Sequence, residues 1–384
     1  MLNGLHFALL LEEDTNPTEF TYSRLRLIEA GARVTVIGLD RLKYRLEDHS
    51  IGYADTTIDR VAGQAFDGLV IPGGLGPEKL RQNAQVIDLV KTCHAQGKLC
   101  AAICHGQLVL ISAGVMRGVR ATAAWSMMDD LRWVGAVVPE KVRAVRDGHI
   151  VTAIFPQDLP QFFHLIFEAL SELEGISLPD GYPSRLAGQT WGIVIDDASD
   201  AVQVHYLRLR VQEEGGRSLL LGRRAGQEVR LSSPAWEWGE LGLRARVERA
   251  LPAPGVIGSC DTEAELDSQA VKAEDLDGLL LPGGLATWMI RGHPGLRELI
   301  HAMNVAGKPI GAVERGPKLL FFTGALDGRA VTCAPQMRDD IIQSVVPVEY
   351  RDDPVVCDGN LLTCQGTDNL PEFMKTLLAQ YGRH

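Results

Sequence analysis

Residues 67–75 read Asp-Gly-Leu-Val-Ile-Pro-Gly-Gly-Leu, and residues 277–285 read Asp-Gly-Leu-Leu-Leu-Pro-Gly-Gly-Leu. The segments lie 210 positions apart, and the same offset carries Gly106 to Gly316 and several later glycines to glycines. Ungapped self-similarity over such a stretch indicates a duplicated domain. Each segment is an apolar run ending in Pro-Gly-Gly, which is typical of a strand buried on both faces and followed by a turn.

Upstream of this segment the two copies are related by a different offset. Residues 29–31 correspond to residues 213–215, which gives an offset of 184, so the second copy carries about 26 extra residues between Ser218 and Leu276. The stretch 175–183 between the copies is rich in Pro, Gly and Asp, which break helix and strand patterns. A chain of 384 residues fits two cores. We therefore predict domains at 1–175 and 189–384, joined by a linker at 176–188.

Strand and helix patterns alternate along the first copy. Apolar runs bounded by turn residues indicate strands, whereas apolar positions three or four apart indicate helices. The order predicts two tandem flavodoxin-like α/β domains, each a mainly parallel sheet with helices on both faces. The predicted strands are 5–11, 33–37, 66–71 and 99–103; the helices are 17–30, 84–95 and 106–113; a hairpin of 142–145 with 150–154 precedes a helix that carries Phe163, Ile166, Phe167 and Leu170 on one face.

Composition excludes several classes of function. Apolar residues make up 46% of the chain and the net charge is −11, which disfavours a nucleic-acid surface, and no apolar run is long enough to span a membrane. The N-terminal residues lack a secretory pattern, so we expect a cytoplasmic protein. Seven cysteines without a C-x-x-C pair suggest neither a disulfide framework nor a metal site, and we expect no cofactor.

One cysteine stands apart from the others by its position. Cys104 and His105 follow the predicted strand 99–103 and precede a helix, with Gly106 allowing a tight turn. The carboxyl ends of parallel strands converge on one crevice, and a strand-to-helix turn of this kind resembles a nucleophile elbow. We expect the turn to expose the thiol, favour its thiolate and leave backbone donors for an oxyanion at His105, Gly73 and Gly74. The competing interpretation is a buried core cysteine beside an incidental histidine.

The sequence resembles the ThiJ/PfpI superfamily in three segments that follow one another at family spacing. These are Pro-Gly-Gly at 72–74, Ala-Ile-Cys-His-Gly at 102–106 and the run 112–118. The resemblance implies a glutamine-amidotransferase-like fold with a reactive elbow cysteine. It also implies activities that include peptidase or amidase, glyoxalase III-type conversion of 2-oxoaldehydes and isonitrile hydration. Ala124-Trp125 departs from the usual Tyr-Pro of the family, which leaves the substrate open.

The resemblance also implies two candidate acids. Glu19 matches the activating glutamate of the family's first helix, although Asn16, Pro17 and Glu19 also form an ordinary capping box, and both roles stay open. Glu78 matches the glutamate that PfpI-type proteases take from a neighbouring subunit, although an acid in the first turn of a helix also favours the helix dipole.

The second copy has replaced all four chemical positions. Glu314 stands for Cys104, Arg315 for His105, Trp288 for Glu78 and Gln203 for Glu19. The glycines and apolar strand positions persist, so we interpret this copy as a structural or regulatory partner that lacks a nucleophile and takes the place of a second subunit. Because adjacent residues at a turn need not face each other, an ion pair between the first two replacements is left open.

Three functions compete at this stage. The leading one is a cysteine-dependent hydrolase or glyoxalase III-like enzyme, in which the Cys104 thiolate attacks an amide or a 2-oxoaldehyde carbonyl of a peptide or small molecule. The alternatives are a redox or stress sensor that uses oxidation of Cys104, and a non-catalytic binding module. The expected assembly is an intrachain pseudo-dimer of the two copies, with a homodimer of chains as a further expectation.

Overall fold

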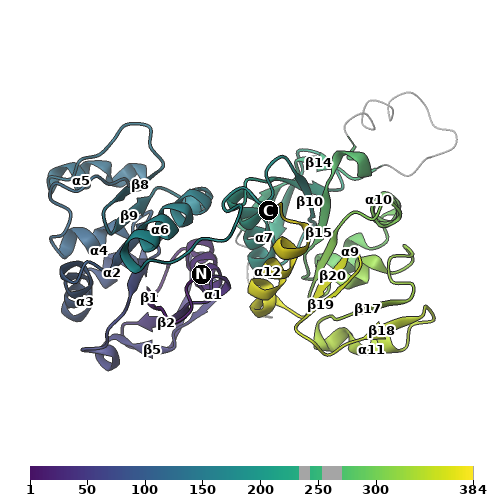
Figure 1. Ribbon diagram of the computed structural model, residues 1–384, viewed down its shortest axis with the longest axis horizontal. Coiled ribbons are helices and arrows are strands. Elements are labelled where there is room, and N and C mark those ends of the chain that lie inside the picture. Colours follow the sequence, from purple (N-terminus) through teal and green to yellow (C-terminus); the bar gives the residue numbers. More distant parts are fainter. Residues whose placement is uncertain (233–242, 253–269, 384) are drawn as a thin grey trace. The chain divides into compact units, whose positions relative to one another are not determined.

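The computed structural model describes residues 1–232, 243–252 and 270–383. The chain divides into two compact units that part between Pro183 and Ser184 (Figure 1). Unit 1 denotes residues 1–183, and unit 2 denotes the described residues from 184 onward.

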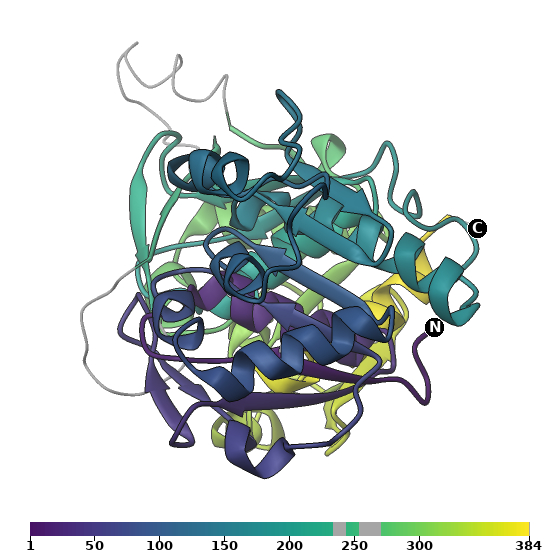
Figure 2. The same cartoon turned by 90° about the vertical axis from the view of Figure 1, so that its left-hand side faces the viewer.

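Unit 1 is built on a seven-stranded sheet in the order β5-β2-β1-β6-β7-β9-β8, parallel except for β8 against β9. Helices α3 and α4 pack on one face, and α1 and α6 cover the other, where Tyr22 meets Phe163 edge to face at 5.5 Å (Figure 2). The elements are β1 His6–Leu10, α1 Pro17–Glu29, β2 Arg33–Gly38, β3 Lys43–Arg45, β4 Ile51–Tyr53, β5 Thr56–Thr57, β6 Gly68–Ile71, α2 Gly76–Leu80, α3 Ala84–Ala95, β7 Leu99–Ile103, α4 Gln107–Ser112, α5 Met128–Trp133, β8 Ala144–Asp147, β9 Ile150–Ala153 and α6 Leu159–Glu174.

Unit 2 repeats this sheet in the order β14-β11-β10-β15-β16-β20-β19. The helix after the fourth core strand is a short 3₁₀ turn, Gly316–Leu320, in place of the α-helix α4. The other elements are β10 Thr190–Val194, α7 Ala201–Glu213, β11 Arg217–Gly222, β12 Glu228–Leu231, β13 Leu243–Arg246, β14 Arg249–Ala250, β15 Gly278–Leu281, α9 Ala286–Ile290, α10 Pro294–Val305, β16 Ile310–Val313, β17 Arg329–Val331, α11 Arg338–Ile342, β18 Val348–Tyr350, β19 Val355–Asp358, β20 Leu361–Cys364 and α12 Leu370–Tyr381.

The duplicated fold is confirmed, and the predicted elements of unit 1 agree with the observed ones to within two residues at most ends. The offset between the copies is 184 at β11, 193 at β14 and 210 at β15, so the insertion is split between two places. Part of it falls at 233–242 and 253–269, outside the described residues.

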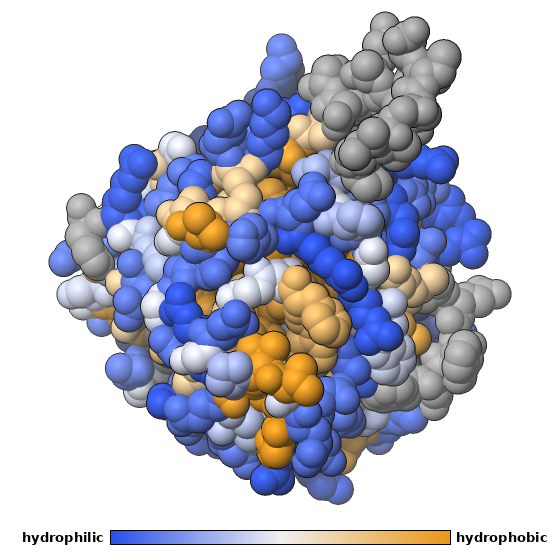
Figure 3. Space-filling view, turned by 90° about the vertical axis from the view of Figure 1, so that its right-hand side faces the viewer, coloured by the Kyte–Doolittle hydropathy of each residue, from blue (hydrophilic) through white to orange (hydrophobic). Residues whose placement is uncertain are grey.

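Within the described residues, every helix is too short or too polar to traverse a lipid bilayer. The face of unit 2 in Figure 3 carries groups of apolar side chains among hydrophilic ones. The large apolar side chains exposed in unit 2 are Trp288, Met289, Val305, Phe322, Ile342 and Val345.

Candidate active site

The turn after β7 has the backbone of a nucleophile elbow. Cys104 has a φ of 62°, in the left-handed region that costs a non-glycine residue about 1–3 kcal/mol. A Cβ at Gly106 would lie 2.3 Å from the carbonyl oxygen of Ile71, so only glycine lets the turn approach β6. The N–H of Ala124 donates to the Cys104 carbonyl at 3.1 Å and holds the turn from the other side.

The thiol itself is enclosed, not exposed as the sequence led us to expect. Cys104 is 7% exposed, and a Cβ built on Gly73 would stand 2.5 Å from its Cβ. The Pro-Gly-Gly turn after β6 therefore presses directly against the cysteine, which explains why a glycine is needed there. The backbone N–H groups of Gly74 and His105 lie beside the thiol and act to lower its pKa.

Glu19 reaches this same point from α1. Asn16 caps the helix by accepting the Glu19 N–H at 3.1 Å, but the carboxylate does not return to Asn16 to complete a capping box. Its Oε2 instead accepts the N–H of Gly73 at 2.6 Å, and the side chain is fully buried beside Cys104. Because its N–H is taken by Glu19, Gly73 is not available as an oxyanion donor, which corrects that prediction.

Burial controls the protonation of both groups. Complete burial raises the pKa of Glu19 to about 8, so its carboxyl is mostly protonated at neutral pH. Burial, and then the negative charge of ionised Glu19, raises the pKa of Cys104 to about 12, against the opposing effect of the two backbone N–H donors. The low thiol pKa that we expected from the helix N-terminus is therefore wrong, because desolvation of the thiolate outweighs the donors.

His105 projects toward both the cysteine and a serine that sequence reasoning missed. Its Nδ1 lies 3.5 Å from the Cys104 sulfur, and its Nε2 lies 3.3 Å from the Ser126 hydroxyl oxygen. Glu47, between β3 and β4, also interacts electrostatically with His105, and its carboxylate accepts the Asn16 side-chain amide at 2.9 Å. Ser126 adjoins the Ala124-Trp125 pair that departs from the family, which was a usable signal, whereas nothing in the sequence marks Glu47.

Glu78 is not brought to the thiol within unit 1. It lies in the first turn of α2 with its side chain 53% exposed, and its carboxylate is 3.8 Å from Arg81. An intersubunit role for it stays a prediction.

The corresponding site of unit 2 keeps the backbone and fills the space with an ion pair. Glu314 has a φ of 59° and accepts the N–H of Gly284 at 2.8 Å. Its carboxylate also accepts a hydrogen bond from the Arg315 guanidinium, so the two adjacent side chains do form an ion pair. Gln203 accepts the N–H of Gly283 at 2.7 Å, as Glu19 does from Gly73. Trp288 packs beneath Arg315, with the guanidinium 5.8 Å from the ring centre. Unit 2 thus keeps the backbone of the elbow, with the Glu314 carboxylate at the position that the Cys104 thiol has in unit 1.

Replacing Arg315 by alanine is expected to lower the stability of unit 2 by about 2–3 kcal/mol and to leave turnover within a small factor. The Arg315 side chain is 8% exposed, so its loss leaves the Glu314 carboxylate without its countercharge. Urea unfolding and activity assays check both parts, and Glu314→Ala/Arg315→Ala should recover some of the lost stability. A large fall in turnover at unchanged stability would contradict the interpretation of unit 2 as inert.

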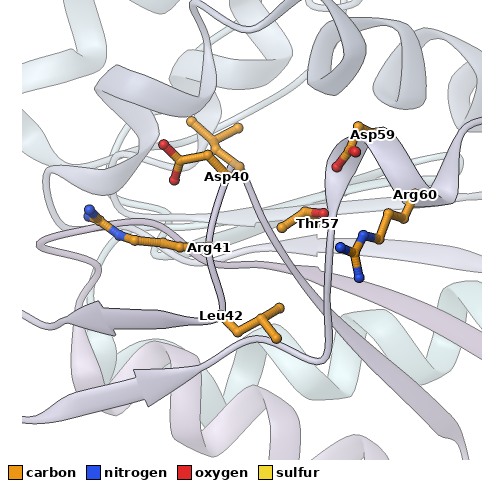
Figure 4. Close-up of a pocket in the computed structure, with 7 residues that line it drawn as sticks. Asp40, Arg41, Leu42, Thr57, Asp59 and Arg60 are labelled. Atoms are coloured by element: carbon orange, nitrogen blue, oxygen red, sulfur yellow. The ribbon is translucent and has the colours of Figure 1, made fainter.

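A separate depression lies beyond this group, beside β2 and β5. It has a volume of about 370 Å³, and its labelled side chains come from two segments, residues 40–42 and 57–60 (Figure 4). Arg41 and Arg60 supply positive charge, and Asp40 and Asp59 supply negative charge. None of the residues identified around Cys104 lines it.

Comparison with known proteins places this chain in a family. The model of the DJ-1/PfpI family matches residues 6–169 and 225–380, so the chain belongs to the DJ-1/PfpI family, with one match in each unit. Protein DJ-1 homolog D of Arabidopsis thaliana is 27% identical over 340 residues, which is 85% of this chain and 81% of that protein. Deglycase PfpI of Pyrococcus furiosus is 33% identical over 155 residues, covering 40% of this chain and 93% of the relative. A crystal structure of Drosophila melanogaster DJ-1beta has 28% identity and a TM-score of 0.41, covering 46% of this chain and 92% of that chain.

Proposed function

We propose that unit 1 is a cysteine-dependent enzyme in which the sulfur of Cys104 attacks an electrophilic carbonyl carbon. The observation that carries the proposal is the convergence of three groups on one sulfur at a positive-φ turn. A buried carboxyl comes from Glu19, an imidazole from His105, and backbone N–H donors from Gly74 and His105. Such a set supplies a nucleophile, a base and oxyanion donors in one place.

The raised pKa of Cys104 decides how the nucleophile is formed. Because its pKa is raised to about 12, the free thiolate is scarce at neutral pH, and the proton must leave as the sulfur–carbon bond forms. The Nδ1 atom of His105, 3.5 Å from the sulfur, is placed to take it. The backbone N–H groups beside the sulfur are then free to donate to the oxygen of the substrate carbonyl.

The proposed substrates are 2-oxoaldehydes and the adducts that they form with amines, and the name deglycase given to the Pyrococcus relative favours them. Amide cleavage is the other reaction that the same nucleophile supports. The raised pKa of the Cys104 thiol works against a primary role as a redox sensor, because oxidation follows thiolate character. Turnover of methylglyoxal, of its amine adducts or of fluorogenic peptides by the full chain tests the proposal, and activity on none of them would refute it.

Glu78→Ala alone is expected to keep activity within a small factor, because Glu19 already places a carboxyl beside Cys104 within the same chain. The assay compares this variant with Cys104→Ala and with equal mixtures of the two. If each variant is inactive and mixing restores turnover, the site is shared between chains and Glu78 supplies its acid.

A further inference from the structure

Ser126 is an exposed residue that lies beside His105, the proposed base. The N–H of Ala124 donates to the Cys104 carbonyl at 3.1 Å, which ties the start of this segment to the nucleophile itself. Trp125 lies edge to face on Phe155 at 5.0 Å, and Met127 is buried in the core. Ser126 stands between these two residues, with its hydroxyl oxygen 3.3 Å from His105 Nε2. Its position is thus set by contacts on both sides.

The two contacts of the imidazole are complementary for a proton transfer. To accept the thiol proton at Nδ1, the neutral ring must carry its hydrogen on Nε2. A hydroxyl oxygen can accept that N–H, which favours the required tautomer. After the transfer the ring is a cation that still donates from Nε2, and a hydrogen bond from a charged donor is stronger than one from a neutral donor. Ser126 therefore stabilises the ring more once it has taken the proton.

We propose that Ser126 is the positioning residue that fixes the tautomer of His105. One chain then supplies the proton donor Cys104, the base His105 and the residue that orients this base. The inference rests on the proposed function. In the step it assists, the S–H bond breaks and its proton moves to Nδ1, while the sulfur bonds to the carbonyl carbon. The π electrons of the carbonyl move to its oxygen, which accepts a backbone N–H. Overall charge is conserved, because the ring becomes a cation as the oxygen becomes an anion.

Unit 2 is consistent with a coupled role. The backbone contact persists there, since the N–H of Ala334 donates to the Glu314 carbonyl at 2.9 Å. At the offset of 210, however, His105 corresponds to Arg315 and Ser126 to Gln336. Unit 2 therefore keeps the segment but has neither the histidine nor the serine hydroxyl. The serine occurs together with the histidine, and the fold of the loop does not require it.

The test compares Ser126→Ala and Ser126→Thr with the wild-type full chain, with Ser171→Ala as a matched control. Ser171 donates its hydroxyl to the Ile176 carbonyl near the end of α6 and loses the same group. We expect Ser126→Ala to lower kcat about tenfold with little change in KM, the size of a lost hydrogen bond to a charged group. Ser126→Thr, which restores the hydroxyl, should recover most of this loss, and the control should match the wild type.

A second measurement separates this inference from the proposed function. The rate at which iodoacetamide alkylates Cys104 at pH 7 needs no substrate, and we expect Ser126→Ala to slow it by a similar factor because the thiol has lost an oriented base. Unchanged kcat and alkylation rate in Ser126→Ala, or a threonine variant as slow as alanine in both, would overturn the assignment. If no substrate of the panel is turned over, the proposed function fails while the alkylation rates still decide whether Ser126 orients His105.

Discussion

Cys104→Ala is expected to reduce turnover by at least about a thousandfold, because it removes the sulfur at the elbow that forms the covalent bond in the proposed mechanism. The substitution deletes a small side chain that is almost fully enclosed, so the fold should persist. The measurement is the steady-state rate of the purified full chain on the substrate that the wild type converts best.

Two other cysteines serve as matched controls for this loss. Cys93 lies on the buried face of α3 and Cys364 in the core strand β20, and both are as enclosed as Cys104. Cys93→Ala and Cys364→Ala should each keep turnover near the wild-type value, since neither thiol lies at the elbow. Equal losses in all three variants would remove the basis for choosing Cys104 as the nucleophile.

Glu19→Gln is expected to make unit 1 more stable than the wild type at alkaline pH. In the folded protein the pKa of Glu19 is about 8, against an ordinary value of 4.5. Between these two values the folded state binds more protons than the unfolded state, so the free energy of unfolding falls as pH rises through this window and levels off above pH 8. The shift corresponds to a fall of about 3–5 kcal/mol in the free energy of unfolding of the wild type across this window. The glutamine variant lacks this fall, because glutamine does not ionise.

Unit 2 indicates that glutamine fits this position, since Gln203 accepts the equivalent glycine N–H at 2.7 Å. Amide hydrogen exchange in β1 and β7 at pH 5 and pH 8.5 would report the opening of unit 1 separately. Glu168→Gln, an exposed change on α6, is the control and should follow the wild type. A variant that loses stability with pH as steeply as the wild type would show that Glu19 is ionised at neutral pH.

Much of the fold could be predicted from periodicity and turn residues. The helix 84–95 and the strand 99–103 have the bounds that the sequence indicated, because each is a regular apolar pattern closed by glycine or by a capping residue. The hairpin around Gly148 formed for the same local reason, with that glycine at a φ of 58°. The predicted capping box at 16–19 did not form, because the Glu19 carboxylate accepts the N–H of Gly73, which lies 54 residues away in the sequence.

The sequence by itself determined that the chain holds two copies of one α/β fold and that Cys104 stands at the turn after β7, since spacing along the chain fixes strands, helices and the edge where their loops meet. Only the tertiary structure decided that Glu19 and Ser126 flank this site and that the thiol is closed off from solvent. It also decided that Glu314 and Arg315 neutralise each other in unit 2. The physical reason is that side-chain direction and desolvation depend on contacts between distant segments, and desolvation is the larger influence on the pKa values of Glu19 and Cys104.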